Sequence, residues 1–202
     1  MTSRGSRRRV APSQPTNPVG LVTYARDMAE IRMAVVGAGS WGTTVASLAA
    51  VNTPTVLWAR REPVVESINT NHVNPDYLSG VALSPQLRAT ASLSEAVSTA
   101  DVVVMAVPSQ GFRQVLVEAK SHIRPWVPIV SLAKGLEAGS MLRMSQVANE
   151  VMPGHPVAVL TGPNLASEIS VGQPAASVVA IDDAVIATAL QELFSTPTFR
   201  VY

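Results

Sequence analysis

Glycines in a fixed spacing are the clearest chemical signal in this chain. They form a Gly-x-Gly-x-x-Gly pattern and are Gly37, Gly39 and Gly42. An apolar run at 33–36 precedes them, and the helix-compatible stretch TTVASLAA follows. Glycine allows a tight turn and a close approach of backbone to a ligand, so N–H groups near Ser40 and Trp41 can bind a dinucleotide pyrophosphate. A glycine loop without a ligand is the alternative, and the flanking apolar residues disfavour it.

Two arginines follow the next β-like run, TVLW at 55–58. Arg60 and Arg61 stand about 20 residues beyond the glycines, where an NAD enzyme usually offers an acid to the ribose. Guanidinium groups suit a 2′-phosphate, so the sequence predicts that NADP is accepted alongside NAD. Two ordinary solvated arginines are the alternative interpretation.

Further polar residues follow later apolar runs. Lys134 comes after IVSLA at 129–133, and its ammonium group could hold a negative substrate or polarise a carbonyl. A simply solvated lysine is an equal alternative. The segment Gly162-Pro163-Asn164 is predicted to open a helix, with amide groups directed into the same cleft, or to act only as a helix cap.

The elements that must position these residues alternate between β-rich runs and helix-like segments. This alternation predicts an α/β fold, a Rossmann-type doubly wound and mostly parallel sheet, in which ligands lie beyond the carboxyl ends of the strands. Strands are expected near 31–36, 55–58, 87–90, 101–107, 127–132, 157–161 and 176–180. Helices are expected near 42–50, 62–72, 92–98, 109–121, 140–151, 164–171 and 183–194. Ser92 and Glu95 form a capping-box pattern at one helix start.

Composition narrows the function classes. The chain has 202 residues, 47% of them hydrophobic, a net charge of +1 and no cysteine, which excludes disulfides and thiolate chemistry. Its apolar runs are far shorter than the roughly 20 residues of a membrane span. Basic residues concentrate at the N-terminus, so no nucleic-acid partner is expected, and no metal-ligand spacing is visible. We expect a cytoplasmic protein with a disordered tail over 1–30 and a nucleotide-binding domain over 31–202.

Six segments in order resemble the bacterial NAD(P)-dependent glycerol-3-phosphate dehydrogenases. They are GAGSWGT at 37–43, LWARR at 57–61, NPDYLSGV at 74–81, VPS at 107–109, AKGLE at 133–137 and GPNLASEISVGQPAA at 162–176. The resemblance reaches FRVY at the end of the chain and excludes the first 30 residues. It implies a Rossmann domain followed by a helical domain, and reduction of dihydroxyacetone phosphate to sn-glycerol 3-phosphate, for phospholipid synthesis, by hydride transfer from NAD(P)H.

The resemblance also assigns roles to individual residues. Ser40, Trp41, Arg60 and Arg61 match cofactor positions beside the three glycines, and Ala166 contributes backbone on the nicotinamide side. Lys134 matches a lysine that touches both cofactor and substrate, while Gly162 and Asn164 match substrate positions. The proton-donating lysine of the family would lie beyond Tyr202, so no catalytic residue is assigned to this chain. We expect weak nucleotide binding, poor turnover, and a homodimer only with the helical domain.

Two other functions remain open at this point. The chain could be a non-catalytic nucleotide-binding module, which its length favours. It could also be a related reductase that acts on another keto acid or sugar phosphate. The GPNLASE segment at 162–168 weighs against this last interpretation, because a generic Rossmann enzyme has no reason to carry it.

Overall fold

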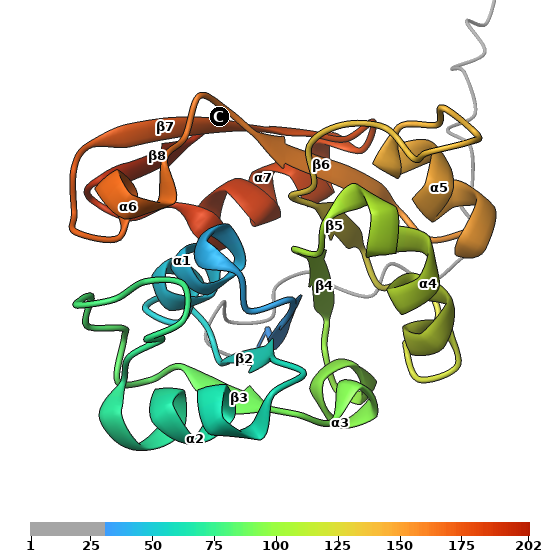
Figure 1. Cartoon of the computed structure of the whole chain (residues 1–202). Coiled ribbons are helices and arrows are strands. Elements are labelled where there is room, and N and C mark those ends of the chain that lie inside the picture. Colours follow the sequence, from blue (N-terminus) through green and yellow to red (C-terminus); the bar gives the residue numbers. More distant parts are fainter. Residues whose placement is uncertain (1–30) are drawn as a thin grey trace, which may run out of the picture.

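Strands form where β-branched and other apolar residues run together, because such side chains pack well on a pleated, buried surface. The computed structural model describes residues 31–202, and its strands pair into one sheet with helices on both faces (Figure 1). The strands are β1 (Met33–Val36), β2 (Thr55–Trp58), β3 (Arg88–Thr90), β4 (Val102–Met105), β5 (Ile129–Ser131), β6 (Val157–Thr161), β7 (Ala175–Ala180) and β8 (Phe199–Val201). The helices are α1 (Ser40–Ala49), α2 (Glu62–Asn71), α3 (Leu93–Ser98), α4 (Ser109–Lys120), α5 (Met144–Val151), α6 (Ala166–Ile169) and α7 (Ala184–Phe194).

The strand order confirms the doubly wound topology. The order is β3-β2-β1-β4-β5-β6-β7-β8, and all neighbours from β3 to β6 are parallel. Val35 of β1 pairs with Leu57 of β2 on one side and with Val104 of β4 on the other. The chain reverses its direction of strand addition between β1 and β4, and an open α/β sheet binds its ligands at such a point.

Each central strand contributes to two hydrophobic cores. Met33 and Val35 face the layer that contains α1, α2 and α7, whereas Ala34 and Val36 face the layer of α3, α4 and α5. Figure 1 shows these helices on opposite sides of the sheet. Because both faces of the strands are buried, their sequences are continuously apolar rather than alternating. This double cover makes the carboxyl edge of the sheet the accessible place for a ligand.

All seven expected strands are present, and four features add to or differ from the expectation. The strand β8 was not predicted, and β7 runs antiparallel to β6. The helix expected from 140 begins at Met144, because an isolated bridge between Leu136 and Arg143 closes the preceding residues into a loop. The helix expected over 164–171 is confined to Ala166–Ile169.

The capping pattern at α3 is half confirmed. The Oγ atom of Ser92 accepts the Glu95 backbone N–H, so the predicted helix start is correct. The Glu95 carboxylate accepts the Thr90 hydroxyl at 2.6 Å instead of closing the box on the Ser92 N–H. The Thr90 hydroxyl oxygen in turn accepts that N–H, and the result is a three-residue relay that joins β3 to α3.

The predicted tail over 1–30 lies outside the described residues. Within residues 31–202, no helix has both the length and the apolar character that a bilayer crossing requires. The same part of the chain contains no group of three or more His, Asp or Glu side chains that could hold a metal ion.

Candidate functional site

One cleft lies at the carboxyl edge of the sheet. It has a volume of about 770 Å³ and collects the residues that directly follow β1, β2, β4, β5 and β6. Of the predicted site residues it is lined by Gly37, Gly39, Ser40, Trp41, Gly42, Arg60, Arg61, Lys134, Gly162 and Asn164. The glycine turn and Lys134 therefore share one crevice. None of the lining residues is acidic, which suits the cleft for an anionic ligand.

The three glycines differ in what a side chain at each position would meet. Gly37 has a φ of 121°, and a Cβ atom there would lie 2.7 Å from the Ala106 carbonyl oxygen at the end of β4. A Cβ atom on Gly42 would lie 2.1 Å from the Gly37 carbonyl oxygen, so only glycine lets α1 pack this closely. A Cβ atom on Gly39 would meet nothing within 4 Å. That side of Gly39 borders the open cleft, where a pyrophosphate group fits.

The N-terminus of α1 offers unpaired amides to that position. Gly39 is the N-cap of α1, no side chain caps the helix, and its first turn has no acidic residue. The first N–H groups of a helix lack partners within it and lie at the positive end of its dipole. The residues present therefore fit the phosphates of a dinucleotide.

A segment that sequence reasoning did not place supports the glycine turn. Asn74 is fully buried, and its Nδ2 atom donates to the Ala38 carbonyl oxygen at 3.0 Å and to the Thr43 hydroxyl at 2.8 Å. The Ser40 hydroxyl donates to the carbonyl oxygen of Tyr77 at 3.0 Å, and Tyr77 lines the cleft. The pair Asn-Pro at 74–75 signals a turn. It does not reveal that this turn packs against residues 36 positions away.

Trp41 has a packing contact besides its place in the cleft. Its ring meets Phe199 of β8 edge to face, with centroids 6.1 Å apart. Phe199 is almost completely buried. The unexpected strand β8 therefore packs against the first turn of α1.

The two arginines differ in their surroundings. Arg61 forms an ion pair with Asp76, in the same segment as Tyr77. Arg60 is exposed and has no ion pair with any residue of 31–202. Both line the cleft next to the end of β2. Arg60 is therefore the cation more available to an added phosphate, because Asp76 already neutralises Arg61.

Lys134 and Asn164 lie at the far end of the cleft from Arg60. The Lys134 Nζ atom is 3.5 Å from the carbonyl oxygen of Gly162. The Asn164 amide donates to the buried hydroxyl of Ser177 on β7, so the interpretation of residue 164 as a helix cap is wrong. The capture of this amide by β7 delays the helix to Ala166. Its Oδ1 atom is buried without a partner among the described residues.

Ala166 is the one predicted site residue that does not line the cleft. It is partly buried and packs against the core that contains α1 and α7. A contact between its backbone and a nicotinamide ring stays a prediction.

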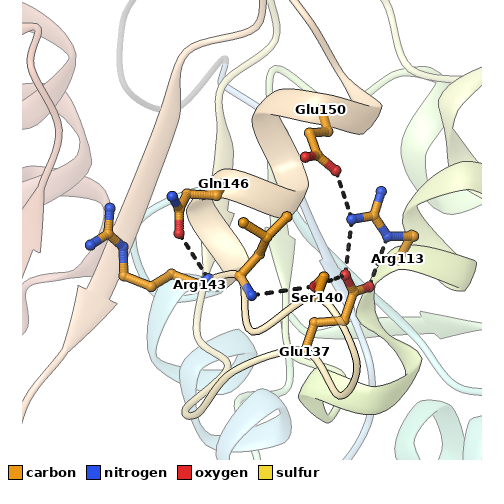
Figure 2. Close-up of polar contacts among 7 residues, drawn as sticks. Arg113, Glu137, Ser140, Arg143, Gln146 and Glu150 are labelled. Carbon is orange, nitrogen blue, oxygen red and sulfur yellow. Dashed lines mark hydrogen bonds and ion pairs between the residues drawn. The ribbon is translucent and has the colours of Figure 1, made fainter.

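An ion network begins three residues after Lys134 in the sequence, at Glu137 (Figure 2). The Arg113 guanidinium donates to Glu137 through Nε at 2.8 Å and Nη2 at 2.9 Å, and Nη2 also donates to Glu150 at 2.8 Å. The Ser140 hydroxyl donates to Glu137 at 2.6 Å. The hydrogen bonds from Arg113, and then from Ser140, lower the pKa of Glu137 to about 2, and its carboxylate raises the pKa of Arg113. Glu137 and Arg113 therefore form a charged pair at neutral pH.

Comparisons with known proteins give a consistent result. Residues 32–187 match the family described as NAD-dependent glycerol-3-phosphate dehydrogenase N-terminus. A relative from Sphingopyxis alaskensis, named a glycerol-3-phosphate dehydrogenase that uses NAD(P)+, is 55% identical over 172 residues, which is 85% of this chain and 52% of the relative. One with the same kind of name from Mycobacterium tuberculosis is 52% identical over 179 residues, which is 88% of this chain and 52% of the relative. The chain thus spans about half the length of the curated relatives it matches.

Solved structures agree with the sequence comparisons. A crystal structure of glycerol-3-phosphate dehydrogenase from Coxiella burnetii superposes with a TM-score of 0.79 at 30% identity and covers 86% of this chain and 53% of that chain. A pyrroline-5-carboxylate reductase from the same organism has a TM-score of 0.62 at 13% identity and covers 87% of this chain and 59% of that chain. The second likeness shows the shared fold alone.

Proposed function

The chain belongs to the family of NAD-dependent glycerol-3-phosphate dehydrogenase N-terminal domains, and on this basis we propose that it binds NAD(P)H for the reduction of dihydroxyacetone phosphate to sn-glycerol 3-phosphate. The activity and the cofactor in this proposal are those that the names of the relatives state. The proposal concerns the cofactor site and the part of the substrate site that this chain forms. The match covers about half of the relatives' length.

One observation carries the proposal most directly. A single cleft without acidic side chains joins the free amides of α1 to Lys134, Gly162 and Asn164. The amides suit a pyrophosphate, and Arg60 suits the phosphorylated adenosine end. A cation and an amide at the other end suit a small phosphorylated ketone. The order of these groups along the cleft is the order required for hydride transfer from a dinucleotide to that ketone.

Different residues of this chain would bind the cofactor phosphates and the substrate. Bound NAD(P)H supplies the hydride. The α1 amides hold the phosphates, and the Lys134 ammonium group stabilises negative charge on the substrate, either at its phosphate or at the carbonyl oxygen. The unpartnered Oδ1 atom of Asn164 is an acceptor for a substrate hydroxyl. No residue of the cleft is placed here as the proton donor.

A non-catalytic nucleotide-binding module is the second candidate. It is favoured by the cleft itself, whose described residues supply amides for phosphates but include no assigned proton donor. Ketone reduction needs a proton at the oxygen as well as a hydride, and a missing proton donor costs about 10²–10⁴-fold in rate. A protein with only this half would bind the cofactor without fast turnover.

Comparison of the chain with a chimera separates the two candidates. In the chimera, the part of the Sphingopyxis alaskensis relative that follows the matched region is fused after residue 202. NADPH binding is measured by fluorescence titration, and NADPH oxidation is followed with dihydroxyacetone phosphate. We expect both proteins to bind NADPH and the chimera to oxidise it much faster. Binding by both without oxidation by either would support the module, and no binding by the chain would refute both candidates.

A further inference from the structure

We propose that Arg113 and Glu137 are positioning residues for Lys134. They hold the loop over residues 134–143 so that the Lys134 ammonium group faces the cleft. This inference rests on the proposed function, because it concerns how a group of that site is oriented. Neither Arg113 nor Glu137 lines the cleft itself.

The loop has little apolar packing of its own. None of residues 134–143 is buried, and Leu136 and Met141 are 41% and 66% exposed. Its backbone also includes left-handed conformations at Gly135, Gly139 and Met141. A segment without buried side chains opens easily unless polar contacts constrain it. The conformation of residues 134–143 therefore depends on its hydrogen bonds.

Those hydrogen bonds converge on Glu137. Its backbone N–H donates to the Leu142 carbonyl oxygen at 2.9 Å, and its carbonyl oxygen accepts the Met141 N–H at 3.0 Å. Its carboxylate accepts two hydrogen bonds from Arg113 in a fork geometry and one from Ser140 (Figure 2). A two-pronged arginine–carboxylate pair fixes both distance and orientation. Glu137 is thus the point at which the loop is fastened to the domain.

Arg113 connects this point to the cleft. It lies on α4, and Pro108 and Gly111 at the beginning of that helix line the cleft. Its Nη2 atom also reaches Glu150 on α5, the helix that follows the loop. One guanidinium therefore joins α4, the loop and α5. Lys134 lies between this junction and β5, with only two residues separating it from Glu137.

The charge of Arg113 is a second reason why its ion pair with Glu137 would keep Lys134 in the cleft. A Glu137 carboxylate without Arg113 would lie three residues from the Lys134 ammonium group and would attract it. In the structure Arg113 occupies that carboxylate, while Lys134 points to Gly162. Loss of Arg113 would therefore release the loop and also provide a competing partner for Lys134. Both effects draw the ammonium group out of the cleft.

The chain offers a direct readout, because Lys120 and Lys134 are its only lysines. Reductive ¹³C-methylation retains their charge and gives each an NMR signal, so Lys120, at the far end of α4, is an internal control. In the unaltered chain with NADP+, dihydroxyacetone phosphate should shift the Lys134 signal and leave Lys120 in place. Glu137→Gln and Arg113→Gln, neither of which adds a lysine, should weaken dihydroxyacetone phosphate binding about tenfold, the loss of part of one charge-assisted hydrogen bond.

Two control variants keep the pair intact. Glu150→Gln removes only the second partner of Arg113, and Arg124→Gln removes an ion pair with Asp101 on another part of the surface. In both variants, dihydroxyacetone phosphate should shift the Lys134 signal and bind with the same affinity as in the unaltered chain. NADPH affinity should change less than twofold in all four variants, because the glycine turn, away from the loop, holds the phosphates.

The outcomes are distinguishable. An unaltered chain that binds neither NADPH nor dihydroxyacetone phosphate would refute the proposed function. If dihydroxyacetone phosphate binds the unaltered chain, and binds Glu137→Gln and Arg113→Gln equally well, the positioning role alone is overturned. A joint fall in melting temperature and NADPH affinity in these two variants would show general structural support, and would also overturn it.

Discussion

Alanine at Gly39 and alanine at Gly42 should have opposite effects on the stability of the domain, although the two glycines belong to the same motif. An alanine Cβ atom at Gly42 would lie 2.1 Å from the Gly37 carbonyl oxygen and 2.7 Å from the Ala106 Cβ atom. Ordinary van der Waals contact begins at 3.4 Å. Helix α1 would therefore have to move away from β1 and β4 by about 1 Å in a closely packed region.

The expected cost of Gly42→Ala follows from that displacement. Overpacking of this kind costs about 1–3 kcal/mol, and the obstacle here is backbone, which yields less than a flexible side chain. For a domain of this size the change corresponds to a fall of about 2–12 °C in melting temperature. Differential scanning calorimetry of the two variants measures it. NADPH affinity should also fall, because the α1 amides move with the helix.

Gly39→Ala is the matched control. The backbone of Gly39 has a φ of −70°, which alanine adopts without strain, and its Cβ atom would meet no atom within 4 Å. The melting temperature should stay unchanged or rise slightly. The rise corresponds to a gain of at most about 1 kcal/mol in the free energy of unfolding. The methyl group would project toward the proposed phosphate position, so NADPH affinity should fall at least about tenfold. Equal destabilisation by both variants, with unchanged NADPH affinity for Gly39→Ala, would refute the reasoning.

Three further predictions concern the rest of the site. Arg60→Ala should weaken NADPH binding about tenfold or more and leave NADH binding nearly unchanged, because only NADPH has the added phosphate; equal losses in parallel titrations would contradict this. Ser177→Ala leaves the Asn164 amide without its partner and should lower the free energy of unfolding by about 1–3 kcal/mol in urea, with an unchanged m-value; Ser170→Ala on the exposed end of α6 is the comparison. The Glu137 pKa of about 2 lies below its ordinary value of 4.5, so its contribution to stability is complete above pH 4.5 and is lost as the pH falls toward 2. Glu137→Gln should remove this part of the acid-induced loss, which urea unfolding between pH 2 and 7 measures.

The sheet and the cleft were predictable because their signals are local. Continuous apolar runs mark strands buried on both faces, and the residues after them must meet at one edge of a parallel sheet. This reasoning brought Gly39, Arg60 and Lys134 together before any coordinates were considered. The family resemblance then assigned the individual roles.

The missed features depend on contacts between distant segments. Strand β8 has only three residues, and its Phe199 packs against Trp41 of α1, a contact that no local pattern reveals. The amide of Asn164 suits a helix cap by sequence, yet Ser177, 13 residues later, binds it instead. The helix expected from residue 140 begins at Met144, because the bridge between Leu136 and Arg143 closes the preceding residues into a loop, to which Arg113 of the distant helix α4 donates hydrogen bonds at Glu137.

An amide-resolved NMR titration of the chain with NADPH tests the central claim most directly. That claim is that a dinucleotide lies in the cleft with its pyrophosphate against the first turn of α1. The largest and earliest shifts should occur at the N–H groups of Ser40, Trp41 and Gly42, followed by those near Arg60 and Lys134. Shifts confined to another surface, with the α1 amides unchanged at saturating NADPH, would contradict the account.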